Sequence, residues 1–366
     1  MGWKSYVHDW ADGIGKNKVS VKLKSKVVEN IAYIIPIEKN TGYLKYFITA
    51  LLFTRISNFF KAIGFYEKSV VIAKEINDRA GEARCYGNLG VDYFGLTDFK
   101  RAGEYQEKAL EIFKEIGDKK EQAICYTGLG NVHSGLGEFE VAIECYENSL
   151  KLYQEIEDKE EEAKSYGNMG HVYSELKDTD KAMLNYRNSL EIANTIGDKE
   201  EELKCYIGIG NVYCYLGSFE YKVETIKHIS NYEAIEYFMK ALEIIKVLGH
   251  KVGELSCYIG LGNVFYNLSN FREAITYYEK ALEISREIKD KHAESACHTN
   301  LGSIYFDDGN VDRGMEYYLN AEKIFKETSQ KHQLKGLYNN LAYFLEKVGD
   351  YENAKKYKQI ATSNKE

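Results

Sequence analysis

The sequence predicts an all-α solenoid, in which pairs of helices stack along one continuous core. A nine-residue stretch, clearest at 125–133, recurs along the chain. Its landmark small residues are Gly90, Gly130, Gly170, Gly210, Gly262, Gly302 and Ala342, so successive copies lie 40 residues apart except for one step of 52. A fixed period in this range is the signature of stacked repeats. Within each repeat, apolar and small residues recur every three or four positions, which is typical of helices.

The repeats occupy most of the chain. Residues 1–42 do not follow the period, and we expect them to form an irregular N-terminal capping segment. Residues 43–366 contain the repeats, eight in all when the degenerate first copy is included. Because a solenoid grows by adding repeats to one core, we expect a single solenoid here rather than two or three separate domains.

Helix starts are marked by aspartates that follow the predicted helix ends. The clearest examples are Asp118, Asp158 and Asp198, each with a glutamate three residues further on. An aspartate cap with an acidic first turn satisfies the exposed N–H groups of the next helix and complements its dipole. We therefore expect a new helix to begin directly after each of these residues. The acidic run 160–162 is then read as a solvated helix start.

The landmark glycine implies close packing. Glycine inside a helix costs about 1 kcal/mol relative to alanine, so its recurrence requires a gain elsewhere. We expect that gain to be close approach to the small residue twelve positions later, as with Ala142 after Gly130.

The single step of 52 residues marks a twelve-residue insertion, 220–231, in the fifth repeat. Val223, Ile226 and Ile229 recur every three residues, which favours a short extra helix or a helix extension. Two interpretations remain open. The insertion is either tolerated variation in a surface loop, or an element that bends the solenoid or covers part of its groove.

Charge and apolar runs limit the possible functions. The net charge of −8 argues against a general nucleic-acid binder, which needs basic surface to neutralise phosphates. No apolar run is long enough to cross a membrane, and the first residues resemble neither a signal peptide nor a lipidation motif. We expect no nucleic-acid partner and no membrane insertion.

Cysteine placement suggests a reducing compartment. Five of the seven cysteines occupy the same position in successive repeats, namely Cys85, Cys125, Cys205, Cys257 and Cys297. Equivalent positions in stacked helices lie roughly 10 Å apart, which is too far for a disulfide. We interpret these residues as small buried hydrophobes and expect a cytoplasmic protein.

The repeat resembles the tetratricopeptide repeat (TPR). The pattern of that family appears in the fifth repeat as Tyr206, Ile209, Gly210, Tyr213, Ala234, Phe238 and Ala241. The resemblance implies a right-handed superhelix of helix-turn-helix units. Forty-residue repeats with a Leu-Gly-Asn core and an Ile-Gly-Asp-Lys link look most like the Pins/LGN class of TPR scaffolds. That class holds extended peptides in its groove and recruits them to cortical or signalling complexes. Its C-terminal GoLoco motifs are missing from this sequence.

The resemblance also implies which first-helix positions line a concave groove. The candidate peptide-binding residues at these positions are Arg84, Asn88, Thr127, Asn131, Lys164, Asn168, His171, Lys204, Asn211, Asn263, Asn300 and Asn340. An asparagine amide donates and accepts, so it can pair with a peptide backbone of any sequence. Arginine and lysine nearby favour carboxylates or phosphates. The predicted ligand is therefore an extended, acidic peptide. The alternative is that the asparagines only cap or pack.

We predict a non-catalytic scaffold or adaptor that binds protein partners and acts in signalling. One alternative is a chaperone-tail receptor of the carboxylate-clamp type. Its five positions would be Thr127, Asn131, Asn168, Lys204 and Gly208, of which Thr127 and Gly208 replace basic residues. Another alternative is a regulatory arm of a larger signalling protein. No catalytic set, metal-ligand spacing or phosphate loop stands outside the repeat pattern, so we expect no enzyme, cofactor or metal.

Overall fold

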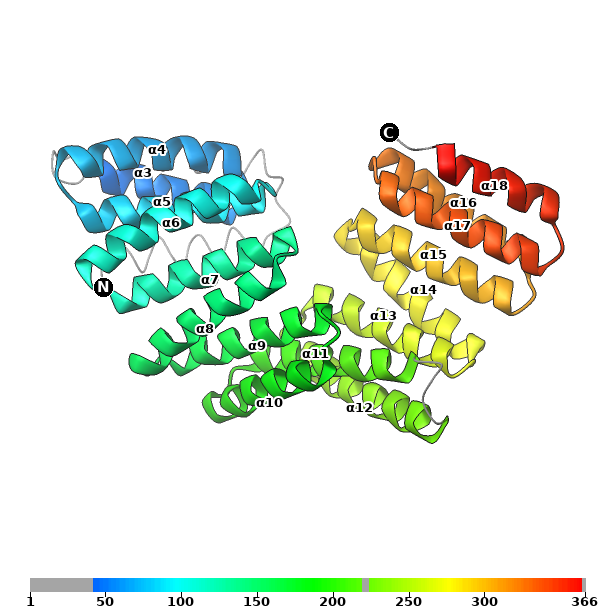
Figure 1. Cartoon of the computed structure of the whole chain (residues 1–366). Helices are drawn as coiled ribbons and strands as arrows, with labels where there is room; N and C mark the ends of the chain where they lie inside the picture. Colours follow the sequence, from blue (N-terminus) through cyan, green and yellow to red (C-terminus); the bar gives the residue numbers. More distant parts are fainter. Residues whose placement is uncertain (1–41, 219–223, 364–366) are drawn as a thin grey trace. The chain divides into compact units, whose positions relative to one another are not determined.

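The structure, a computed structural model, describes residues 42–218 and 224–363 (Figure 1). In these residues the chain forms sixteen α-helices and no strand, which confirms the all-α prediction. The helices alternate as first and second members of eight repeats. They are α3 (Gly42–Arg55), α4 (Phe59–Glu75), α5 (Arg79–Gly95), α6 (Phe99–Ile116), α7 (Lys119–Leu136), α8 (Phe139–Glu155), α9 (Lys159–Glu175), α10 (Thr179–Ile196), α11 (Lys199–Ser218), α12 (Glu224–Leu248), α13 (Lys251–Asn267), α14 (Phe271–Ile288), α15 (Lys291–Asp307), α16 (Val311–Glu327), α17 (Lys331–Lys347) and α18 (Tyr351–Ser363).

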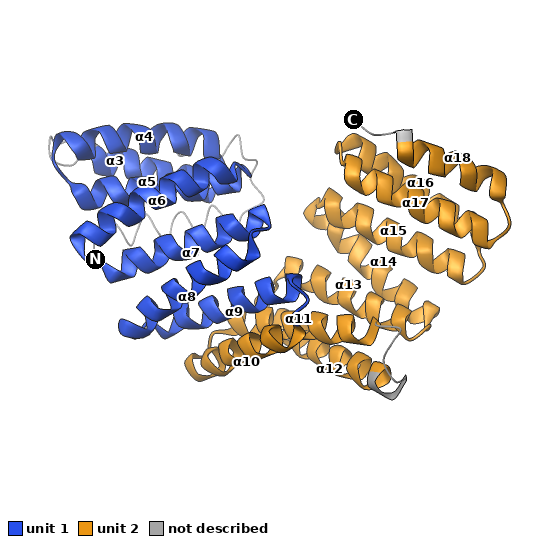
Figure 2. Ribbon diagram, in the orientation of Figure 1, with its two compact units in different colours: residues 1–178 blue, residues 179–366 orange. Residues whose placement is uncertain are grey.

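The chain divides into two compact units, shown in different colours in Figure 2. Unit 1 is Met1–Asp178 and unit 2 is Thr179–Glu366. The boundary falls in the link between α9 and α10, inside the fourth repeat. A single solenoid over 43–366 therefore stays a prediction, and the predicted capping segment 1–42 lies outside the described residues except for Gly42.

The predicted aspartate caps are confirmed. The Asp118 carboxylate accepts a hydrogen bond from the Glu121 backbone N–H at 3.2 Å, and Asp198 accepts one from Glu201 at 3.0 Å. Asp158 caps α9 in the same way. Each cap satisfies one of the N–H groups that a helix start leaves without a partner.

The landmark glycines face a different residue from the one we predicted. A Cβ added to Gly130 would lie 2.6 Å from the ring of Tyr146, sixteen residues later, and one on Gly262 would lie 2.8 Å from Tyr278. The small residue twelve positions after the glycine, such as Ala142 after Gly130, is fully buried. It is not the neighbour that requires the glycine. At Gly130 and Gly262 the close approach is therefore between the first helix and an aromatic ring of the second.

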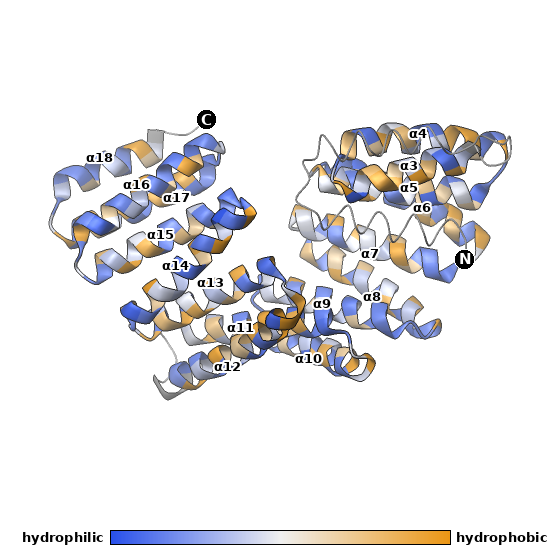
Figure 3. Cartoon of the chain, turned by 180° about the vertical axis from the view of Figure 1, so that it is seen from behind, coloured by the Kyte–Doolittle hydropathy of each residue, from blue (hydrophilic) through white to orange (hydrophobic). Residues whose placement is uncertain are grey.

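Within each unit the core lies between the helices of each pair and between neighbouring pairs, and it is rich in such rings. Tyr278, Tyr318 and Phe238 are 0–1% exposed. The five repeat cysteines are also at most 1% exposed, which confirms them as buried hydrophobes. Figure 3 shows hydrophilic and hydrophobic residues interleaved along the helices of each unit. Among the described helices, none is both long and apolar enough to span a membrane.

The insertion contributes to a helix rather than to a surface loop over its described part. Residues 224–231 form the start of α12, the 25-residue second helix of the fifth repeat. Asn231 is fully buried, and its amide donates to the Gly217 carbonyl of α11 at 3.4 Å. The helix-extension prediction is confirmed for these residues, and the surface-loop interpretation is wrong for them. Residues 220–223 lie outside the described part of the chain.

Candidate functional site

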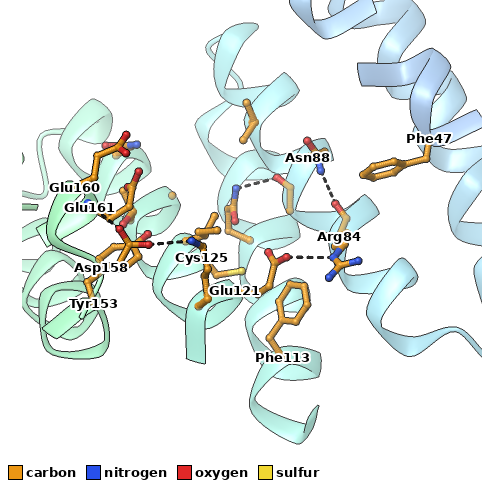
Figure 4. A pocket seen from close by; sticks show the side chains of 18 residues that line it. Phe47, Arg84, Asn88, Phe113, Glu121, Cys125, Tyr153, Asp158, Glu160 and Glu161 are labelled. Atoms are coloured by element: carbon orange, nitrogen blue, oxygen red, sulfur yellow. Dashed lines mark hydrogen bonds and ion pairs between the residues drawn. The ribbon is translucent and has the colours of Figure 1, made fainter. Parts of the chain in front are cut away.

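Unit 1 contains a pocket of about 590 Å³ on the side formed by its first helices (Figure 4). Residues from α3, α5, α6, α7 and α8 and the start of α9 line it. Four predicted site residues are brought together here, namely Arg84, Asn88, Thr127 and Asn131. The forty-residue period places them on two successive first helices, α5 and α7.

Two ion pairs connect neighbouring repeats across the pocket wall. Arg84 Nε of α5 lies 3.1 Å from Glu121 Oε1 of α7. Lys120 Nζ of α7 lies 2.9 Å from Asp158 Oδ2, the N-cap of α9. The hydrogen bond from Lys120 holds the pKa of Asp158 below its usual value. Figure 4 shows Arg84 and Glu121 pointing toward one another.

The start of α9 contributes further carboxylates. Glu160 and Glu161 line the pocket, and each accepts a hydrogen bond from Lys164 Nζ at 2.7 Å. Partial burial opposes the charged form of Lys164, but these two hydrogen bonds outweigh it and raise the pKa of the lysine. The third glutamate of the run, Glu162, is only 6% exposed and accepts a hydrogen bond from Lys159 at 2.7 Å. The interpretation of 160–162 as a solvated helix start is therefore wrong for Glu162.

Several predicted asparagines already have structural partners. Asn88 donates to the Arg84 carbonyl of its own helix at 2.8 Å. Asn131 accepts a hydrogen bond from the Tyr146 hydroxyl at 2.7 Å, and Asn263 accepts the equivalent bond from Tyr278. Such bonds tie the first helix of a repeat to its second. The carbonyl oxygens of Asn131 and Asn263 are thus used in helix–helix contacts, while the peptide-binding role of the asparagines stays a prediction.

The other candidates in unit 1 lie close to the pocket without lining it. Lys164 reaches its wall through Glu160 and Glu161. Asn168 and His171 are further along α9, where Asn168 is partly buried and His171 is exposed. Neither of the two is among the residues around the pocket.

The candidates in unit 2 occupy equivalent positions on its own first helices. Lys204 contacts Glu201 at 3.0 Å, while Asn211 and Asn340 are exposed and Asn300 is partly buried. Gly208 packs under the ring of Tyr186, which leaves no room for a Cβ. The five carboxylate-clamp positions are divided between the two units. The carboxylate-clamp alternative therefore stays a prediction.

The strongest feature that the sequence-based prediction missed is Gln106 of α6. It lines the pocket at the position where most repeats carry tyrosine or phenylalanine, and it is 3% exposed. Its amide nitrogen donates to the Gly87 carbonyl at 3.0 Å. Its departure from the aromatic pattern was visible in the sequence. The sequence did not reveal that Glu121, Asp158 and Glu160 pair with basic residues of other turns and repeats.

The described residues hold no cluster of three or more histidine, cysteine or acidic side chains placed to bind a metal ion. The pocket instead offers hydrogen-bonding groups, paired charges and apolar contacts. Val91 and Ile124 line it and are 50% and 44% exposed. An elongated ligand could lie against these side chains and exchange hydrogen bonds with the helices around them.

The repeated helix pairs define an α-solenoid of the helix-turn-helix type. The chain belongs to the tetratricopeptide repeat family. One model of that family matches residues 50–115, 88–155, 121–195 and 230–287, and a second matches 295–328 and 336–357. No curated protein matches the sequence.

Three solved structures illustrate the similarity of fold. The apo form of the quorum sensor NprR from B. thuringiensis is 16% identical, with a TM-score of 0.67, and the match covers 99% of this chain and 98% of that one. The Rap conjugation gene regulator of plasmid pLS20, solved with the Phr* peptide, is 15% identical with a TM-score of 0.61 and 94% of both chains covered. Aspartyl phosphate phosphatase F from Bacillus subtilis is 12% identical with a TM-score of 0.61, covering 100% of this chain and 92% of that one. At these identities the similarity is one of fold.

Proposed function

We propose that the protein is a non-catalytic interaction module that binds an extended peptide segment of a protein partner along its first helices. The observation that carries this proposal is the pocket of unit 1, in which amides, paired charges and apolar side chains surround a hollow of about 590 Å³. Two proteins of the same fold support it by analogy, because one is a quorum sensor and the other was solved with a peptide.

Gly87 is the most informative residue for this proposal. It lies inside α5 and lines the pocket, and a Cβ added to it would meet only the Cβ of Ala109, at 4.0 Å. Packing therefore does not require a glycine here, although glycine costs a helix about 1 kcal/mol relative to alanine. The missing side chain leaves room for a ligand to approach the backbone.

The charges of the pocket support binding better than catalysis. Arg84, Lys120 and Lys164 are each held by a carboxylate of the pocket wall. Their ion pairs also weaken the case for an acidic ligand, since these are the basic groups that would have to receive it. The proposed function therefore does not depend on the charge of the peptide. The cytoplasmic location also remains a prediction from the cysteines.

The test is a selection of displayed random twelve-residue peptides on the full chain, followed by affinity measurements on two variants. Gly87→Leu fills the pocket. Gly64→Leu is the matched control, because Gly64 lies inside α4 of the same unit with nothing within 4 Å of an added Cβ. We expect selected peptides to bind Gly87→Leu at least tenfold more weakly and Gly64→Leu as wild type. Failure to enrich any peptide, or equal loss in both variants, would overturn the proposal.

A further inference from the structure

Gln106, which lines the pocket of unit 1, has a buried hydrogen-bond acceptor without a partner in the described residues. Gln106 is 3% exposed, and its amide nitrogen is used by the Gly87 carbonyl. Its Oε1 is buried and accepts no hydrogen bond from the described residues. Leaving such an acceptor unpaired inside the protein is energetically unfavourable. A ligand that donates an N–H to this oxygen would recover that cost.

Gln106 cannot turn away easily to find another partner. It lies between two glycines, and a Cβ on either Gly90 or Gly128 would come within 2.7 Å of its side chain. Its amide is therefore enclosed by α5 and α7 at the edge of the pocket. The Gly87 carbonyl accepts the hydrogen bond of the Gln106 amide nitrogen. Because Gly87 has no side chain, it leaves open space beside Gln106.

The charged groups around the pocket have a net negative charge. The lining residues include two basic side chains, Arg84 and Lys120, and four carboxylates, those of Glu121, Asp158, Glu160 and Glu161. Lys164 pairs with two of the carboxylates from outside the lining. Counting it as well, three positive charges face four negative ones. An acidic group entering the pocket would meet this excess and would have to displace an existing ion pair.

We propose that this pocket binds a positively charged N–H donor of the peptide, either a lysine or arginine side chain or a free N-terminal ammonium. The inference rests on the peptide-binding function proposed above and adds the chemistry of the residue bound in unit 1. One N–H of the donor bonds Gln106 Oε1, while the surrounding carboxylates balance its charge. The exposed faces of Val91 and Ile124 contact the apolar stem or the neighbouring residue of the peptide.

The simpler explanation for the acidic residues is helix capping, since carboxylates in a first turn complement the dipole of α9. That explanation accounts for Asp158, Glu160 and Glu161 but not for Gln106. Gln106 belongs to α6 and replaces a packed aromatic residue with a polar amide. A water molecule bound to its oxygen would leave the pocket without preference for a cation, and the experiment separates these cases.

The experiment uses an array of octapeptides with apolar flanks and a single variable centre, probed with the full chain. One set has lysine or arginine at the centre and blocked ends; matched sets carry glutamate or glutamine there. A fourth set has no basic side chain but a free N-terminus. We expect wild type to retain the lysine and arginine set, the free N-terminal set, or both, at least tenfold better than the glutamate set. The set that is retained identifies the source of the cation.

Two variants connect the preference to the pocket. Glu160→Gln/Glu161→Gln should lower retention of the cationic peptides by about three- to tenfold, and Gln106→Leu should lower it as well. Glu144→Gln/Glu147→Gln, which removes the same charge from exposed positions of α8, should leave it unchanged. If the double variant melts below wild type, Glu160→Gln alone replaces it, since that side chain is 61% exposed.

The outcomes separate this inference from the proposed function. Retention of glutamate or neutral peptides in preference to cationic ones, or a cationic preference that survives both pocket variants, overturns the inference and leaves peptide binding standing. Retention of no peptide of any charge overturns both.

Discussion

The first helices contain two kinds of glycine. Substitution by alanine should have opposite effects on protein stability at the two kinds. A Cβ on Gly130 would overlap the ring of Tyr146, whose hydroxyl is held by Asn131. We expect Gly130→Ala to destabilise the protein by about 1–3 kcal/mol through overpacking. Gly87→Ala meets no such ring and should stabilise it by about 0.5–1 kcal/mol. Urea unfolding of the two variants measures both changes, and a stabilising Gly130→Ala would contradict the assigned contact.

The buried cysteines should be chemically inert in the folded protein. Burial raises the pKa of Cys125 to about 12 and that of Cys145, which is less buried, to about 11. Because only the thiolate is nucleophilic, we expect both to react slowly with iodoacetamide at pH 8, with Cys145 reacting first. Mass spectrometry of timed samples gives the order. Rapid labelling of Cys125 in the native protein would show that its helix opens readily.

How far the site could be predicted is clearest at Gln106 and Arg84. The repeat placed Arg84, Asn88, Thr127 and Asn131 near one another, because equivalent positions of stacked helices face the same way. It could not reveal that Arg84 pairs with Glu121, since 37 residues separate them and the contact depends on side-chain conformations. Gln106 was visible as a break in the aromatic pattern. Its unpaired oxygen became apparent only once its neighbours were known.

At the scale of elements, helix bounds were the most predictable feature. The aspartate caps of the sequence predict the first residues of α7, α9 and α11 as the structure has them. Such signals are local, which is why they are reliable without tertiary information. The twelve-residue insertion was less predictable, because its interpretation depends on what it packs against.

Asn231 makes the insertion testable as part of the core. Its amide nitrogen donates to the Lys227 carbonyl at 2.9 Å, and its oxygen accepts from Asn267 of α13 at 3.5 Å. We expect Asn231→Leu to cost about 1–3 kcal/mol, since polar groups of α11 and α13 lose a partner. Tyr232→Ser, at a neighbouring position that is 65% exposed, should change stability by less than about 0.5 kcal/mol. Equal effects in thermal melts would contradict the anchoring role of Asn231.

Over the whole molecule, each unit contains a buried titratable group of its own. In unit 1, Asp92 is fully buried at a position where most other repeats carry valine or isoleucine, and burial raises its pKa to about 7 despite a hydrogen bond from Thr54. Its second oxygen has no hydrogen-bond partner in the described residues. Between pH 4 and 7 the folded state therefore holds a proton that the unfolded state has lost. The stability of unit 1 should fall over this range as pH rises, by up to about 4 kcal/mol, and then level off.

Unit 2 contains the opposite case. His298 is 3% exposed, and burial together with the nearby Arg286 guanidinium lowers its pKa to about 4. Its Nε2 faces Arg286 at 3.3 Å, so the ring stays neutral in the folded state. Below pH 6.5 His298 binds a proton in the unfolded state but not in the folded state. The stability of unit 2 should therefore fall as pH drops from 6.5 to 4, by up to about 3 kcal/mol.

Acidification from pH 7 to 5 should thus stabilise unit 1 while it destabilises unit 2. Amide hydrogen exchange, corrected for the intrinsic pH dependence of the exchange rate, reports each unit separately through α5 and α15. Protection of α5 should rise toward pH 5 and that of α15 should fall. Asp92→Asn should remove the first trend only, and His298→Gln the second only. If both helices follow the same trend, or either variant changes both, the two groups do not control the pH dependence of their own units.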